Sequence, residues 1–343
     1  MRYVFALVLG GALAMLLTPL VKRFSLRHGI LDQPNQPRKK HARPVPLLGG
    51  VAIFLAFSLT TAVFWQLGVL QDGRILPLQI AGILLAGLVL MIGGYLDDRY
   101  NLSPSRQLLF PLVAVALALM SGIRISHVTN PFGGIAVFPA GFGIVVAGIW
   151  LLGMTYTTKF LDGLDGLTTG VTTIGAFAIF IVSLYWDVPQ SGTSILALAL
   201  AGACLGFLVY NWHPAKIFLG EGGSLFCGFL LGALAIISGS KIATTLLVMG
   251  VPILDGLWVI LRRLWQRQSV ARGDRKHLHF LLLDLGLSHR QTVALLFILT
   301  AAFGTTSFFL QTRGKIAALS LLFILTAALL LGALRLYQRK QSS

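Results

Sequence analysis

Charged residues are scarce in this chain. Asp, Glu, Lys and Arg make up 11% of its 343 residues, whereas soluble domains carry about 25%. Hydrophobic residues reach 56%, and the mean hydropathy is +0.84. Such a chain has too little polar surface to face water on all sides, which excludes an ordinary soluble globular protein. Cysteine is nearly absent too: Cys204 and Cys227 fall in apolar runs, so we expect buried, inert thiols and no disulfide framework.

Acidic residues are the scarcest charged type. Eleven Asp and Glu stand against 27 Lys and Arg, the formal net charge is +16, and Glu221 is the one glutamate. In a soluble protein this excess would suggest nucleic acid as a partner. In an apolar chain it indicates a basic face held against anionic headgroups. We therefore expect membrane lipids as partners, and no nucleic acid.

Long apolar runs recur along the chain, and a transmembrane helix needs roughly 20 such residues. The predicted spans cover residues 3–20, 47–69, 78–96, 108–125, 142–158, 167–186, 193–210, 224–239, 242–261, 291–310 and 316–334. The first run leads into Lys22 and Arg23 without a small-residue cleavage site, which favours a span over a signal peptide. Because backbone polar groups need partners inside lipid, we predict an all-α polytopic membrane helical bundle of about eleven transmembrane helices. Residues 1–343 form a single integral membrane domain.

The basic residues are divided unequally between the two sets of loops. Six lie on one side: Arg2, Arg74, Arg124, Lys241, Arg313 and Lys315. The other twenty-one of the 27 lie on the opposite side, which is therefore predicted to be cytoplasmic. This assignment puts the N-terminus outside and the C-terminus inside.

Most acidic residues gather at the same predicted face, which the rule for basic residues does not explain. They are Asp32, Asp97, Asp98, Asp162, Asp165, Glu221, Asp274 and Asp284. Asp255 lies within the ninth span, where a carboxylate is costly unless it faces the bundle interior. A hydrogen-bonded packing contact and a functional role are equally open for Asp255.

Three short motifs carry most of these carboxylates. Asp97 and Asp98 end the third span, where a helix C-terminus disfavours anions and a divalent metal would compensate for them; the bland alternative is a solvated helix end. Asp162 and Asp165 each precede a glycine, and their spacing of three puts them on one face of a helical turn; the alternative is a simple interhelical turn. Gly220-Glu221 opens the eighth span, where free N–H groups suit phosphate, although a helix-capping carboxylate is also open.

Two basic loops face the same side. Residues 32–46 form a proline-stiffened loop that suits either headgroups or a substrate. Residues 262–290 contain His277 and His279 among several cations, which favours diphosphate binding. A zinc site lacks a third nearby ligand, and the charges alone would also follow from membrane orientation. Carboxylates, cations and glycine loops on one face together indicate metal-assisted phosphoryl chemistry.

These motifs, in this order, resemble those of the polyprenyl-phosphate N-acetylhexosamine-1-phosphate transferases over nearly the whole chain. The family's Arg-Lys-x-His-x-x-Pro-x-Pro loop corresponds to residues 38–46, followed by Gly49-Gly50. Its Asp-Asp, Asp-Gly-x-Asp-Gly-Leu, Phe-x-Gly-Asp-x-Gly-Ser and His-x-His-His motifs correspond to residues 97–98, 162–167, 218–224 and 277–280.

The resemblance implies that a polyprenyl (undecaprenyl) phosphate lipid attacks the β-phosphorus of a UDP-N-acetylhexosamine, with Mg²⁺ or Mn²⁺ as cofactor, and releases UMP. The implied roles are catalytic for Asp97 and Asp98; metal-binding for Glu221 and Asp98; nucleotide- or sugar-binding for Asp162, Asp165, Lys159 and Gly220; and phosphate-binding for Lys40, His41, Arg43, Arg275, His277 and His279. The reaction would be the first membrane step of cell-envelope polysaccharide synthesis at the inner (plasma) membrane. A homodimer is the implied assembly if the chain is not a monomer.

Other interpretations stay open. The basic loop before His277 favours N-acetylglucosamine 1-phosphate as the transferred group, and phospho-N-acetylmuramoyl-pentapeptide transfer is the alternative. A transporter would place charges along its spans, whereas only Asp255 lies well inside one. A lipid-phosphate-binding homologue without activity is suggested by three departures from the family pattern. Lys159 replaces an Asn, Glu221 replaces the metal-binding Asp, and Phe280 replaces the last His.

Overall fold

The computed structural model describes residues 1–34, 43–71, 75–130, 132–186, 192–239, 241–269 and 276–342. Within these ranges, ten helices are long and apolar enough to cross a membrane, and a shorter apolar helix, α4, covers Pro104–Met120. The predicted all-α polytopic bundle is therefore confirmed, with ten helices of spanning length in the described residues where about eleven were predicted. Cys204 and Cys227 are buried free thiols, also as predicted.

The long helices follow the predicted spans closely, with shifted ends. They are α1 (Arg2–Arg27), α2 (Gly49–Gln66), α3 (Pro77–Tyr100), α5 (Ala140–Leu161), α6 (Leu167–Trp186), α7 (Gly192–Asn211), α8 (Gly220–Ile237), α9 (Ile242–Trp265), α11 (His289–Phe309) and α12 (Thr312–Ser342). The fourth span begins earlier than predicted because Pro104 occupies the first turn of α4, and Gly122 with a φ of +88° follows its end.

Short elements lie between the helices and were not predicted. The described residues form two antiparallel strand pairs, β1 (Leu31–Asp32) with β2 (Val45–Pro46) and β3 (His127–Thr129) with β4 (Ile135–Val137). A seven-residue helix, α10 (Leu278–Asp284), follows the loop that contains His277. It forms because its apolar residues, Leu281 and Leu282 among them, are buried against the bundle.

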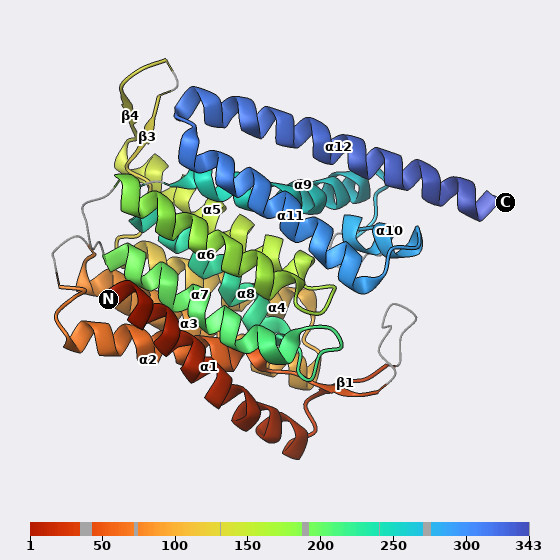
Figure 1. The fold of residues 1–343 in the computed structure, drawn as a ribbon, viewed down its shortest axis with the longest axis horizontal. Helices are drawn as coiled ribbons and strands as arrows, with labels where there is room; N and C mark the ends of the chain where they lie inside the picture. Colours follow the sequence, from red (N-terminus) through yellow and green to blue (C-terminus); the bar gives the residue numbers. More distant parts are fainter. Residues whose placement is uncertain are drawn as a thin grey trace.

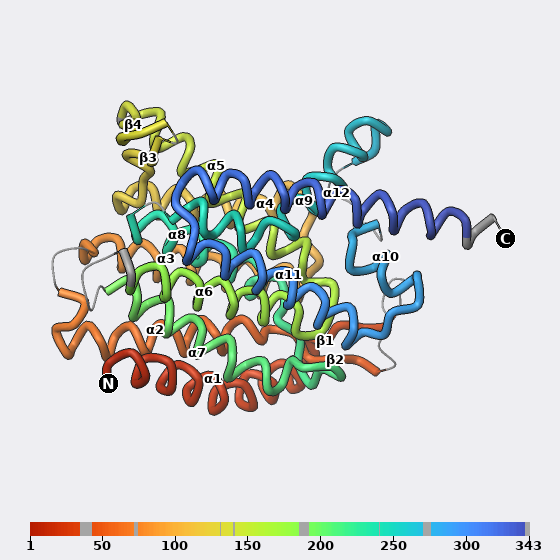
Figure 2. The backbone as a smooth tube through the Cα atoms, turned by 45° about the horizontal axis from the view of Figure 1, so that its top comes forward, coloured from red at the N-terminus to blue at the C-terminus, as the bar shows by residue number. Residues whose placement is uncertain are grey.

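Helix α8 lies at the centre of the bundle, and α1 and α12 lie at its edges (Figures 1 and 2). Of the most apolar stretch of α8, 89% of the residues are buried inside the protein, against 22% for α1 and 28% for α12. Helices α2, α3, α5 and α6 all pack against α8. A motif at the start of α8 is therefore placed where several helix ends meet.

Glycine allows two neighbours to approach α8 at backbone distance. A methyl group on Gly94 of α3 would lie 2.1 Å from the amide nitrogen of Gly222. A methyl group on Gly50 of α2 would lie 2.1 Å from the Cα of Gly223. Small residues at such crossings let membrane helices pack closely. These contacts bring the Asp-Asp motif and the Gly49-Gly50 segment onto the Gly-Glu motif.

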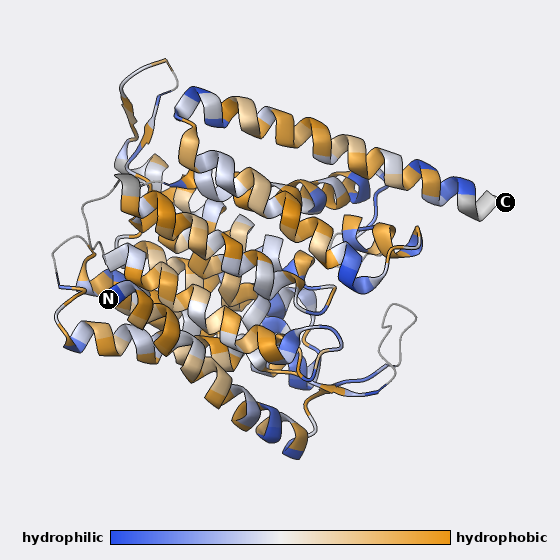
Figure 3. Cartoon of the chain, viewed as in Figure 1, coloured by the Kyte–Doolittle hydropathy of each residue, from blue (hydrophilic) through white to orange (hydrophobic). Residues whose placement is uncertain are grey.

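Hydrophilic residues gather at one end of the bundle, the right-hand side of Figure 3. The ends of α3 and α5, the starts of α8 and α11, and α10 all lie at this end (Figure 1). We call it the motif face, because it contains the described parts of the motifs identified above. Its assignment to the cytoplasm stays a prediction.

Candidate active site

The contact between Asp98 and the start of α8 lies at the centre of the motif face. Both carboxylate oxygens of Asp98 accept from the backbone N–H of Glu221, at 3.2 and 3.3 Å. Gly220 makes this contact possible: its φ is +77°, and a methyl group there would lie 2.6 Å from Asp98 Oδ2. The positive end of the α8 dipole favours an anion at this position. An α8 N–H that was expected to face phosphate thus binds the Asp98 carboxylate.

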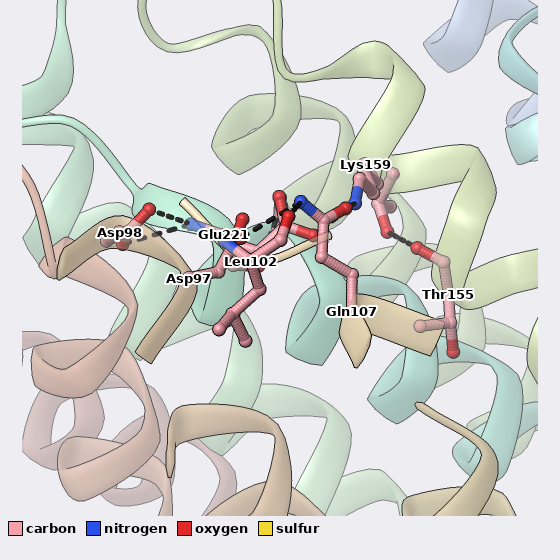
Figure 4. A network of polar contacts seen from close by, with 9 residues as sticks. Asp97, Asp98, Leu102, Gln107, Thr155, Lys159 and Glu221 are labelled. Carbon is pink, nitrogen blue, oxygen red and sulfur yellow. Dashed lines mark hydrogen bonds and ion pairs between the residues drawn. The ribbon is translucent and has the colours of Figure 1, made fainter. Parts of the chain in front are cut away.

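A chain of polar side chains links Asp97 to Glu221 (Figure 4). Asp97 Oδ1 accepts from the Leu102 N–H and from Gln107 Nε2, both at 2.9 Å. Lys159 Nζ donates to Gln107 Oε1 at 3.2 Å and forms an ion pair with the Glu221 carboxylate. Two of the three departures from the family pattern, Lys159 and Glu221, therefore contact one another.

Asp162 brings a further carboxylate toward the same place. It follows the end of α5 and keeps accessible surface. The pKa of Asp162 is raised to about 7, chiefly by desolvation, and the negative charges of Glu221 and Asp165 act in the same direction. Asp98 lies within electrostatic reach of Asp97, Asp162 and Glu221. Four carboxylates thus share one region, which calls for a compensating cation.

The donor atoms of this region fit a hard divalent cation. All four side chains offer carboxylate oxygens, the ligands that Mg²⁺ and Mn²⁺ take in proteins. Glu221 Oε1 is fully enclosed and, apart from the Lys159 ion pair, has no hydrogen-bond partner in the described part of the chain. The structure therefore brings the predicted metal residues Asp98 and Glu221 together, and they could hold a metal ion. Their roles stay predictions.

Asp165 faces a different set of partners from Asp162. Its Oδ2 contacts His213 Nδ1 at 2.7 Å and accepts from the Ala215 N–H at 3.1 Å. Asp165, His213 and His289 each offer a donor atom, all within 4.8 Å of one another, so they could also hold a metal ion. However, the two imidazole rings are stacked 3.9 Å apart at 14°. Nearly parallel rings cannot both aim an in-plane nitrogen at one ion, so one ring would have to turn.

The two histidines of the His-x-His motif are buried. His277 Nδ1 lies 2.9 Å from Asp255 Oδ2, and Asp255 Oδ1 accepts from the Leu278 N–H at 2.8 Å. Asp255 therefore makes a hydrogen-bonded packing contact that anchors α10. His279 is 1% exposed, and burial lowers its pKa to about 3, so the ring is neutral and supplies no positive charge to a phosphate.

The first basic loop reaches the site through its last residues. Phe218 N–H donates to the Pro46 carbonyl at 2.8 Å, and the Gly49 N–H donates to the Phe218 carbonyl at 3.0 Å. The Gly50 N–H donates to the Leu219 carbonyl at 2.7 Å. This segment is thus clamped to the loop before α8. Arg43 is exposed, whereas the predicted phosphate ligands Lys40, His41 and Arg275 lie outside the described residues.

Three polar residues of the motif face were missed by sequence reasoning. Gln107 bridges Asp97 and Lys159, and His213 contacts Asp165. Asn211 Oδ1 accepts from the Gly166 N–H at 3.1 Å, and Asn211 Nδ2 donates to the Ile217 carbonyl at 3.0 Å. Neutral polar residues near a span end are common, so only the nearby carboxylates could have drawn attention to them.

The fold and the site define a multi-pass membrane protein with an acidic, metal-competent centre at one end of its bundle. The sequence profile of glycosyl transferase family 4 matches residues 80–239. A probable undecaprenyl-phosphate N-acetylglucosaminyl 1-phosphate transferase of Bacillus subtilis is 31% identical over 334 residues, covering 94% of this chain and 89% of the relative.

Two further relatives match most of the chain. A decaprenyl-phosphate N-acetylglucosaminephosphotransferase of Mycolicibacterium smegmatis is 30% identical, covering 88% of this chain and 80% of the relative. A phospho-N-acetylmuramoyl-pentapeptide-transferase of Bacillus pumilus is 30% identical, covering 75% and 82%. The chain belongs to glycosyl transferase family 4, the polyprenyl-phosphate sugar-1-phosphate transferases whose motifs it resembles.

Proposed function

We propose that this protein transfers N-acetylglucosamine 1-phosphate from UDP-N-acetylglucosamine to polyprenyl (undecaprenyl) phosphate and releases UMP. The proposal is supported by the relatives that match along most of the chain. The single observation that carries it is the convergence of Asp97, Asp98, Asp162 and Glu221 on the motif face. Acidic residues from α3, the α5–α6 loop and α8 meet there, as metal-assisted phosphoryl transfer requires.

Each group has a chemical task in this reaction. Asp98 and Glu221 would hold a Mg²⁺ ion, which neutralises phosphate oxygens of the bound substrates. Asp97 would act as a base toward the attacking lipid phosphate, because the Leu102 N–H and the Gln107 amide hold its carboxylate in one direction. The loop containing Asp162 and Asp165 would bind the nucleotide sugar. His277, held by Asp255, would contact the diphosphate through its other ring nitrogen.

The proposed setting follows from the charge distribution. The motif face would lie at the cytoplasmic side of the plasma (inner) membrane, where UDP-sugars are available, with the N-terminus outside. The acceptor would reach the site from the bilayer, since its polyprenyl chain is as apolar as lipid. A homodimer remains a prediction without a described interface.

One assay tests the reaction and its runner-up. Purified protein is incubated with undecaprenyl phosphate, Mg²⁺ and either UDP-N-acetylglucosamine or UDP-N-acetylmuramoyl-pentapeptide, and UMP is measured by chromatography. We expect UMP with UDP-N-acetylglucosamine and none when EDTA is added. UMP only with the muramoyl donor would support the alternative that one relative's name suggests. No UMP with any UDP-sugar would refute the enzyme and favour a lipid-phosphate-binding homologue.

A further inference from the structure

The ion pair between Lys159 and Glu221 lies inside the proposed metal site. The side chains of Lys159 and Glu221 are 23% and 16% exposed, so water screens their attraction only partly. Asp98 engages the backbone N–H of Glu221 and leaves the Glu221 side chain free for a cation. The ammonium of Lys159 therefore occupies a carboxylate that a metal ion would need.

We infer that Lys159 is a resident cation that a divalent metal ion must displace from Glu221. The inference rests on the proposed function, because it takes Glu221 as a metal ligand. With the metal absent, Lys159 neutralises Glu221 among neighbouring carboxylates. With the metal present, a monovalent and a divalent cation would share one carboxylate a few ångströms apart, and their repulsion drives the ammonium away.

The Gln107 side-chain oxygen is the hydrogen-bond acceptor that Lys159 keeps when its ammonium leaves Glu221. The orientation of its amide follows from chemistry, because Nε2 donates to Asp97 Oδ1 and to the Leu102 carbonyl while Oε1 faces the ammonium. Lys159 Nζ already donates to this oxygen at 3.2 Å. Leaving Glu221 thus keeps one hydrogen bond and frees one N–H donor of the ammonium.

The consequence is a metal affinity that Lys159 lowers. Removing the positive charge while keeping most of the apolar stem, as in Lys159→Met, should leave Glu221 unneutralised and strengthen divalent binding at least about tenfold. Lys159→Arg keeps the charge and should keep the wild-type affinity within about threefold. Lys216→Met is the matched control, because Lys216 is an exposed lysine whose loss changes the net charge equally.

The test measures Mn²⁺ binding directly, from the electron paramagnetic resonance signal of the unbound ion in titrations of purified, detergent-solubilised protein. We expect Lys159→Met to bind at least about tenfold more tightly than wild type, and Lys216→Met to match wild type. Binding that is seen only in Lys159→Met would also support the competition. Equal or weaker affinity in Lys159→Met, in protein that elutes as one species in size-exclusion chromatography, would overturn it.

Two further measurements separate this inference from the proposed function. Adding Glu221→Gln to Lys159→Met should abolish the gained affinity, and a double variant that keeps it would place the ion elsewhere and overturn the inference. UMP release is assayed on the wild type alone. Tighter Mn²⁺ binding in Lys159→Met without UMP release from any donor would refute the proposed reaction and support the role of Lys159. UMP release from the wild type with unchanged Mn²⁺ affinity in Lys159→Met would support the reaction and overturn the role of Lys159.

Discussion

Gly220→Ala should remove activity by moving Asp98, whereas the equally strained Gly239→Ala should not. Both glycines have a φ of +77° and flank α8 at opposite ends. An alanine in this left-handed conformation costs about 1–2 kcal/mol, so both variants should lose similar thermal stability. Only Gly220 would press on a neighbour, because no atom of the described residues lies within 4 Å of a methyl group on Gly239.

The structure sets the size of the displacement. The new methyl group would lie 2.6 Å from Asp98 Oδ2, and ordinary contact begins near 3.4 Å, so the carboxylate or the α8 N-terminus must retreat by about 0.8 Å. The Leu48 backbone nitrogen, 3.0 Å from the same methyl group, limits the directions in which the α8 N-terminus can shift. A misplacement of about 1 Å in a catalytic arrangement costs roughly 100-fold in rate.

The assay compares UMP release at saturating donor with the melting temperature of each variant. We expect Gly220→Ala to lose roughly 100-fold in kcat and Gly239→Ala to keep wild-type kcat, with similar, modest falls in melting temperature. Near-wild-type kcat in Gly220→Ala would refute the placement of Asp98 in the reaction. A matching loss in Gly239→Ala would show that backbone strain in α8, and not the Asp98 contact, controls activity.

Other perturbations give equally definite expectations. Asp98→Asn should abolish UMP release while the melting temperature stays near that of wild type, and turnover near the wild-type level would contradict its role. Glu221→Asp should retain or raise activity, since Asp keeps a carboxylate ligand, and a dead variant would contradict the proposed metal site. Asp255→Leu should lower stability by about 1–3 kcal/mol, because it leaves the His277 ring and the start of α10 without their acceptor; an unchanged melting temperature would argue against the anchor. Burial lowers the pKa of His279 from 6.5 to about 3. Between about pH 6.5 and pH 3, His279 is therefore protonated in the unfolded chain but neutral in the folded chain. Stability should therefore fall as the pH drops through that window, and in His279→Gln the melting temperature should fall less with decreasing pH.

The helices and the motif face were predictable because both depend on local sequence. A transmembrane span is recognised in a sequence as a run of about 20 apolar residues. Most predicted spans coincide with observed helices. The short helix α10 was missed because a seven-residue segment with five apolar residues, next to a basic loop, gives no span signal. Asp255 could not be interpreted from sequence, because its partners His277 and the Leu278 N–H lie 22 and 23 residues away.

The pairing of residues within the site lay beyond the sequence for the same reason. Lys159 was expected to bind the nucleotide or sugar, yet its ammonium contacts Glu221, which lies on another helix. Asp165 shares a motif with Asp162, but its carboxylate is held by His213. Gln107 carried no signal of its own, since a neutral amide becomes informative only when its neighbours are known.

The sequence by itself determined that this chain enters a bilayer as a helical bundle and belongs to a phosphosugar transferase family. Hydropathy and motif order are local properties, and neither needs the packing of one helix on another. Only the tertiary structure decided which carboxylates meet and which cation neutralises them. Backbone-to-backbone packing of Gly94 on Gly222 and of Gly50 on Gly223 brings α3 and α2 onto α8. That close approach sets Asp98 on the Glu221 N–H, at the end of the bundle where Lys159 faces the Glu221 carboxylate.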